Sequence, residues 1–105
     1  MKILLIEDNP SDVLLVQEGL RQIDFSGDFE VIEDGESAVN YFHSLAQSPN
    51  KENLRTWPSL VLLDLNLPKL NGLEVLRFVK GHPNLERIPV LILSTSECKQ
   101  DMARA

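Results

Sequence analysis

Short runs of hydrophobic residues alternate along the chain with segments whose hydrophobic residues recur every three or four positions. Four of these runs have the length of a strand, and the uninterrupted aliphatic ones are typical of strands buried on both faces of a sheet. The run FEVIE alternates instead, which indicates a more exposed strand. We predict strands over residues 2–6, 29–33, 59–64 and 88–93.

The segments between these runs predict three amphipathic helices. The first begins after Asn9, whose side chain can cap a helix, with Pro10 at the first helical position. The other two are expected over residues 36–46 and 71–80, with the pair Asp34–Gly35 as a turn before the second helix. The inward-facing positions of the first helix are spaced by three or four residues, namely Val13, Val16, Leu20 and Ile23.

The remaining segments predict a long loop and a final helical turn. Ser, Pro, Asn and charged residues favour a loop over residues 47–58, and a last helical turn is expected from Ser96 or Glu97 to Ala105. Strands that alternate with helices of this length predict right-handed βαβ units around a parallel sheet, in one α/β domain over residues 1–105.

Acidic residues follow two of the predicted strands. Glu7 and Asp8 come directly after the first strand, Asp64 ends the third, and Ser94 follows the fourth. Ligands of such sheets bind outside the carboxyl ends of the strands, so these side chains converge if the first and third strands are neighbours. Carboxylates in close contact repel, and they either hold a proton or bind a cation.

Oxygen ligands of this kind favour a hard cation, with Mg²⁺ as the default. We expect Glu7 and Asp8 to bind the ion, and the backbone carbonyl of Asn66 lies where it could complete the coordination. Asp64 is then a further metal ligand or a nucleophile that attacks phosphorus, and the Ser94 hydroxyl could donate a hydrogen bond to a phosphoryl oxygen.

Composition excludes several classes of function. The net charge is −6, and no cluster of Lys and Arg is present, which argues against nucleic-acid binding. No apolar run is long enough to span a membrane, and the chain enters its first strand directly, without a signal peptide. The single Cys98 excludes an internal disulfide and fits a reducing, cytoplasmic environment.

Four segments together resemble the receiver domain of two-component response regulators, in family order and at family spacing. They are ILLIEDN (3–9), EDGESAV (33–39), LVLLDLNLPKLNGLEVL (60–76) and IPVLILSTS (88–96). The resemblance implies a flavodoxin-like doubly wound parallel sheet with strand order 2-1-3-4. It also implies that Asp64 is the phosphorylated aspartate, Glu7 and Asp8 the acidic pair, and Ser94 the switch hydroxyl.

The resemblance also implies a function and a partner. Asp64 would take a phosphoryl group from the phosphohistidine of a sensor histidine kinase with Mg²⁺, and slow self-dephosphorylation would reset it. The chain would be a signalling module that acts through protein–protein contact and not an enzyme. The opening EDNPSDV, the long loop before Trp57 and the motif DLNLP are similar to single-domain regulators paired with bacterial phytochrome kinases.

The same residues bear on three other functions. An aspartate-nucleophile phosphatase needs a second acid two residues after the nucleophile, where this chain has Asn66. A flavin or nucleotide binder needs a hydroxyl-rich or glycine-rich phosphate cradle, whereas the segment EDNPSD is acidic. A non-phosphorylated interaction module stays open, because the family's phosphoryl-binding lysine lies on a fifth strand and neither Lys69 nor Lys99 ends a core strand.

The resemblance stops before the fifth strand and fifth helix of the family. The strand over residues 88–93 would then be a hydrophobic sheet edge, which favours pairing with another chain. We expect the 105-residue chain to form a homodimer or a strand-exchanged species, detectable by analytical ultracentrifugation. A monomer that melts cooperatively in calorimetry would contradict this expectation.

Overall fold

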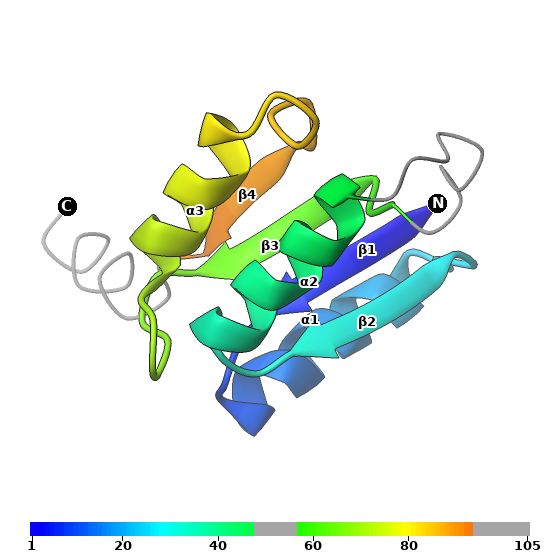
Figure 1. Ribbon diagram of the computed structural model, residues 1–105. Helices are drawn as coiled ribbons and strands as arrows, with labels where there is room; N and C mark the ends of the chain where they lie inside the picture. The colour runs from blue at the N-terminus through cyan, green and yellow to red at the C-terminus, as the bar shows by residue number, and fades with distance from the viewer. Residues whose placement is uncertain (48–56, 94–105) are drawn as a thin grey trace, which may run out of the picture.

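The computed structural model describes residues 1–47 and 57–93 of the chain, which form strands and helices in alternation. The elements are β1 (Lys2–Ile6), α1 (Pro10–Gln22), β2 (Asp28–Ile32), α2 (Gly35–Gln47), β3 (Leu60–Asp64), α3 (Gly72–Gly81) and β4 (Val90–Leu93). All strand pairs are parallel, and the order is β2-β1-β3-β4 (Figure 1). The predicted α/β fold with strand order 2-1-3-4 is therefore confirmed.

Helices cover both faces of the sheet: α2 and α3 lie on one face and α1 on the other (Figure 1). The central strands β1 and β3 are consequently buried on both sides, which explains their uninterrupted aliphatic sequences. Within the described ranges, no helix is both long and apolar enough to cross a lipid bilayer. The larger core, under α2 and α3, is built around Leu4, Ile6, Phe42, Val61 and Leu63, and the smaller core, under α1, around Ile3, Leu5 and Leu62.

Side-chain caps fix where the helices begin. Asn9 Oδ1 accepts a hydrogen bond from the Ser11 amide at 2.9 Å at the start of α1, as predicted. Asp34 Oδ1 accepts one from the Ser37 amide at 2.7 Å, so Asp34 caps α2 and Gly35 is its first residue. The turn predicted at Asp34–Gly35 is found only at Asp34, where the chain bends before α2; Gly35 already belongs to the helix.

Two other predictions differ from the structure. Ile23, expected to face the core, is 72% exposed because α1 ends at Gln22. The fourth strand begins at Val90 instead of residue 88, because the Ile88 amide donates to the Leu85 carbonyl at 3.0 Å and Pro89 has no amide hydrogen. The remaining observed boundaries agree with the predicted ranges to within one residue. The predicted last helical turn, and most of the predicted loop, lie outside the described residues.

Replacing Phe42 by Ala tests the larger core. Phe42 is 0% exposed and meets Tyr41 edge to face, with ring centroids 5.3 Å apart. The substitution should lower the free energy of unfolding by about 3–5 kcal/mol, because it leaves a cavity under α2. Urea denaturation measures the change, and Leu15→Ala is the control, since Leu15 is 66% exposed and should change stability by no more than about 0.5 kcal/mol. Equal effects of the two substitutions would contradict this packing.

Candidate functional site

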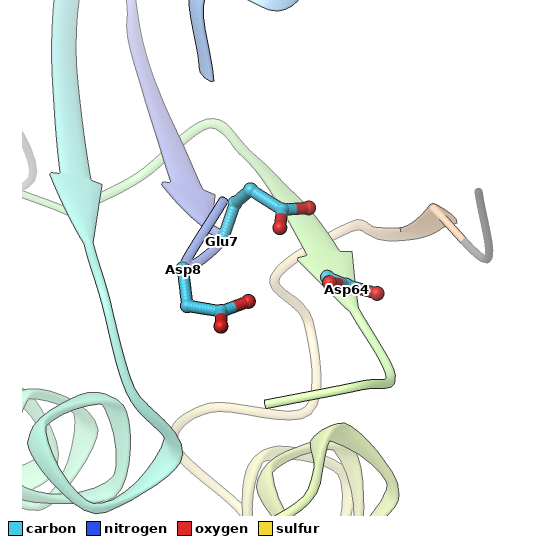
Figure 2. A group of neighbouring side chains, drawn as sticks. All are labelled: Glu7, Asp8 and Asp64. Carbon is cyan, nitrogen blue, oxygen red and sulfur yellow. The ribbon is translucent and has the colours of Figure 1, made fainter. Parts of the chain in front are cut away.

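The carboxyl ends of β1 and β3 meet at one edge of the sheet. The register pairs Ile6 with Leu63, so the next residues, Glu7 and Asp64, leave the two strands side by side. Figure 2 shows Glu7 and Asp8 directly after β1, with Asp64 at the end of β3 beside them. The sheet ladder therefore brings together two segments that are far apart in the sequence.

Glu7, Asp8 and Asp64 form a cluster of three carboxylates, which we call the acid cluster. Each contributes one oxygen to a set in which all atoms lie within 4.8 Å of one another. Glu7 and Asp64 are almost fully buried, at 1% and 4% exposure, whereas Asp8 is exposed. The three side chains thus converge as predicted, with two carboxyl groups buried and one exposed to solvent.

Backbone amides orient the two buried carboxyl groups. The Asn9 amide donates to Glu7 Oε1 at 3.0 Å, and the Asn66 amide donates to Asp64 Oδ1 at 3.1 Å. Both bonds span two residues, so each acid accepts a hydrogen bond from the loop that follows its own strand. The carboxylates are thereby tied to the backbone instead of being free to turn toward water.

Burial in this cluster raises the pKa of Glu7 from 4.5 to about 7. Loss of hydration is the largest cause, and the hydrogen bond and the negative charge of Asp64 act in the same direction, against the Asn9 amide, which lowers the pKa. Near neutral pH the buried Glu7 carboxyl group is therefore divided between its protonated and its ionised form. A divalent cation would offset the negative charge gathered here, and a set of carboxylate oxygens fits a hard ion such as Mg²⁺.

Two other residues were predicted at this site. Asn66 is exposed and its amide holds Asp64, but the predicted metal contact of its carbonyl stays a prediction. Ser94 lies outside the described residues; the preceding residue, Leu93, is in register with Asp64. At the next helix, a Cβ atom at Gly72 would overlap the Asp64 carbonyl oxygen, which explains why glycine stands at the start of α3.

The role of Gly35 is not predicted by the sequence pattern. The structure places it against the loop between β3 and α3, at Leu70. Asp-Gly is a common turn signal, and the partner of this contact is distant in the sequence. A glycine directly before a predicted helix, where serine or a charged residue would serve as well, is the available signal.

Comparison with known proteins decides the family. The sequence matches the response regulator receiver domain over residues 3–105. The chain belongs to this family. Receiver domains of two-component response regulators are signalling modules that are phosphorylated on an aspartate, and they are not classical enzymes.

Individual relatives agree with this assignment. The receiver is 40% identical over 100 residues to the response regulator Rcp1 of Synechocystis sp., covering 95% of this chain and 65% of that protein. It is 38% identical over 103 residues to the probable methanogenesis regulatory protein FilR2 of Methanothrix harundinacea, covering 98% and 63%. The chain thus spans somewhat less than two thirds of the length of these relatives.

Solved structures with the same fold carry related names. The structure of the phosphorylated cyanobacterial phytochrome response regulator RcpA has a TM-score of 0.76 and 40% identity, over 97% of this receiver and 70% of that chain. The Mn²⁺-bound form of the response regulator Rcp1 has a TM-score of 0.72 and 42% identity, over 97% and 70%. In both cases the sequence identity is also high, so the similarity extends beyond the fold.

Replacing Glu7 by Gln tests the energetic consequence of burying this carboxyl group. The folded chain, with a Glu7 pKa of about 7, binds more protons than the unfolded chain with the ordinary value of 4.5. The free energy of unfolding should therefore fall as pH rises from 4.5 to about 7. The glutamine variant keeps an acceptor for the Asn9 amide and does not titrate. Without divalent cations, the free energy of unfolding of the wild type should fall across this pH range by on the order of 1–3 kcal/mol more than that of the glutamine variant.

Urea unfolding of both proteins at about pH 5 and about pH 8, in buffer with a chelator, measures the difference. Adding Mg²⁺ at the higher pH should stabilise the wild type more than the variant. Identical pH dependence of the two proteins would show that Glu7 ionises in the folded chain as it does in the unfolded one.

Proposed function

We propose that Asp64 is the phosphoacceptor and that it takes a phosphoryl group from the phosphohistidine of a sensor histidine kinase. The observation that carries the proposal is the acid cluster: three carboxylates from two loops, within 4.8 Å, at the carboxyl edge of a receiver fold. Carboxylates gathered in this way are costly without a cation, and a buried carboxylate beside a cation is a competent nucleophile toward phosphorus.

The transfer needs one bond to form and one to break. A carboxylate oxygen of Asp64 attacks phosphorus, the bond between phosphorus and the histidine nitrogen breaks, and the departing imidazole keeps the electron pair and takes up a proton. The Asn66 amide, 3.1 Å from Oδ1, orients the attacking carboxylate. Water later hydrolyses the acyl phosphate, which returns the Asp64 carboxylate and releases inorganic phosphate.

Glu7, Asp8 and Asp64, with the backbone carbonyl of Asn66, would hold Mg²⁺ in this proposal. When bound, the ion would offset the negative charge on the transferring phosphoryl oxygens. The Mn²⁺-bound form of Rcp1 supports a divalent cation in a related receiver. The Ser94 hydroxyl, which follows β4 in the sequence, would donate a hydrogen bond to a phosphoryl oxygen.

The relatives support a kinase of phytochrome type as the partner. RcpA, solved in a phosphorylated form, is described as a phytochrome response regulator, and it is 40% identical to this chain over the matched residues. We further propose that the chain acts in the cytoplasm through protein–protein contact, without a membrane partner. The net charge of −6 argues against a nucleic-acid partner. One domain over residues 1–105 and a homodimer or strand-exchanged form stay predictions.

Incubation with acetyl phosphate and Mg²⁺ tests the proposal directly. Intact mass should increase by one phosphoryl group in the wild type and not in Asp64→Asn, because the amide cannot attack phosphorus. Asp28→Asn is the matched control, since Asp28 is exposed and begins β2, and it should behave like the wild type. Asp8→Asn should raise the Mg²⁺ concentration at half-maximal rate by at least about tenfold, as loss of a partner at a metal site commonly does.

Failure of the wild type to gain mass, with Mg²⁺ binding demonstrated by calorimetry, would overturn the proposal. The chain would then be a receiver-like interaction module that is not phosphorylated. A gain that persists in Asp64→Asn would mean that another residue is the acceptor.

A further inference from the structure

The start of α2 lies against the loop that follows Asp64 (Figure 1). A Cβ atom on Gly35 would overlap the carbonyl oxygen of Leu70 and would lie 2.9 Å from Leu70 Cβ. The Gly35 amide also donates to the Pro68 carbonyl at 3.4 Å. Backbone thus packs directly on backbone, and no side chain fits between the two segments.

Gly35 is needed for this close approach and not for its own backbone conformation. No glycine in the described residues has a positive φ. An alanine at position 35 would therefore be free of backbone strain, and its whole effect would come from pushing on Leu70. Gly19, by contrast, has nothing within 4 Å of the position of its Cβ atom. Alanine substitutions at Gly35 and Gly19 therefore differ in which atoms the added methyl group contacts.

The loop itself is held in a strained turn at this contact. Lys69 has a φ of 68°, a left-handed conformation that costs a residue with a side chain roughly 1–2 kcal/mol. The Leu70 amide donates to the Pro68 carbonyl at 2.8 Å, which closes a γ-turn around Lys69. A turn of this kind persists only where its surroundings impose it, and here the neighbour is the start of α2.

The other end of the same loop is fixed on Asp64. The Gly72 amide donates to the Leu65 carbonyl at 3.0 Å, and a Cβ atom at Gly72 would lie 2.6 Å from Leu65 Cα. The Asn66 amide holds the Asp64 carboxylate at 3.1 Å. A loop this short, held at both ends, has little room to absorb a push at Leu70, and Asn66 and Asp64 lie next along it.

We propose that Gly35 is a positioning residue for Asp64. Because Gly35 has no side chain, its backbone packs against the loop over residues 65–71 and holds (seats) it in place, and the position of this loop sets the orientation of the Asp64 carboxylate. The inference rests on the proposed function only for its kinetic consequence. Its structural consequence, a loop seated by Gly35, is independent of any chemistry at Asp64.

Gly35→Ala should slow phosphorylation of Asp64 by acetyl phosphate by about 10- to 100-fold at saturating Mg²⁺, since small displacements of a reacting group have effects of this size. The rate is corrected for the folded fraction, obtained from urea denaturation of each variant. Gly19→Ala, on the exposed side of α1, is the matched control and should keep the wild-type rate within about twofold.

A second substitution distinguishes positioning from a loss of stability. Lys69→Gly removes the strain of the left-handed residue and lets the turn yield to an added methyl group without moving Asp64. The double variant Gly35→Ala/Lys69→Gly should therefore be phosphorylated at least about threefold faster than Gly35→Ala, at equal folded fraction. A rate of Gly35→Ala equal to that of the wild type, or a defect that Lys69→Gly does not relieve, would overturn the inference.

Amide hydrogen exchange separates this inference from the proposed function. Residues 65–72 should exchange faster in Gly35→Ala than in the wild type and in Gly19→Ala. If the wild type does not accept phosphate but this difference appears, the proposed function fails and the seating of the loop stands. If exchange over residues 65–72 is unchanged, the seating of the loop by Gly35 is wrong whatever the kinetics show.

Discussion

Two carboxyl groups buried side by side are the interaction on which this site depends. Glu7 and Asp64 are 1% and 4% exposed, and burial beside a like charge disfavours the ionised form of a carboxyl group. Burial is the largest cause of the raised pKa of Glu7, about 7, and the hydrogen bond and negative charge of Asp64 add to it. The folded chain therefore favours whatever brings positive charge to this edge, whether a proton or a divalent ion.

The sheet keeps the two acids together despite their repulsion. β1 and β3 are central strands, hydrogen-bonded to each other and to a further strand on the other side, and their aliphatic side chains are buried on both faces. Separating Glu7 from Asp64 would require breaking this ladder and exposing both cores, which is far more costly than the repulsion. Each acid also accepts a hydrogen bond from the amide two residues further along the chain, which ties its carboxyl group to the segment that follows the strand.

Local patterns in the sequence were sufficient for the strands, the parallel sheet and the approach of Glu7, Asp8 and Asp64. The approach follows because parallel neighbours end at the same edge. The different burial of Glu7 and Asp8 could have been read from alternation, since Glu7 continues the positions of Ile3 and Leu5, which face the smaller core.

Features that depend on contacts between distant segments were not predictable from local patterns. Ile23 has the spacing of an inward-facing residue, but the end of α1 at Gln22 leaves it exposed. The pair Asp34–Gly35 has the composition of a turn, and only the bond from the Ser37 amide to Asp34 shows that it begins a helix. The contact of Gly35 with Leu70 has no signature in either segment alone, because it arises from how the two loops pack.

Three loops at the carboxyl edge of the sheet thus have unequal roles. The loops after β1 and β3 carry the carboxylates, whereas the loop after β2 contributes none to the acid cluster and supports the loop after β3. Between Asp64 and Gly72, the chain includes a proline with a fixed φ, a lysine in a left-handed conformation and amides bonded to Asp64 and Leu65. Few dihedral angles remain free, so the orientation of Asp64 is determined by backbone contacts that reach it from α2 and α3. For the proposed phosphoryl transfer, a carboxylate held in this way would be pre-organised, because little conformational freedom would be left to lose on reaction.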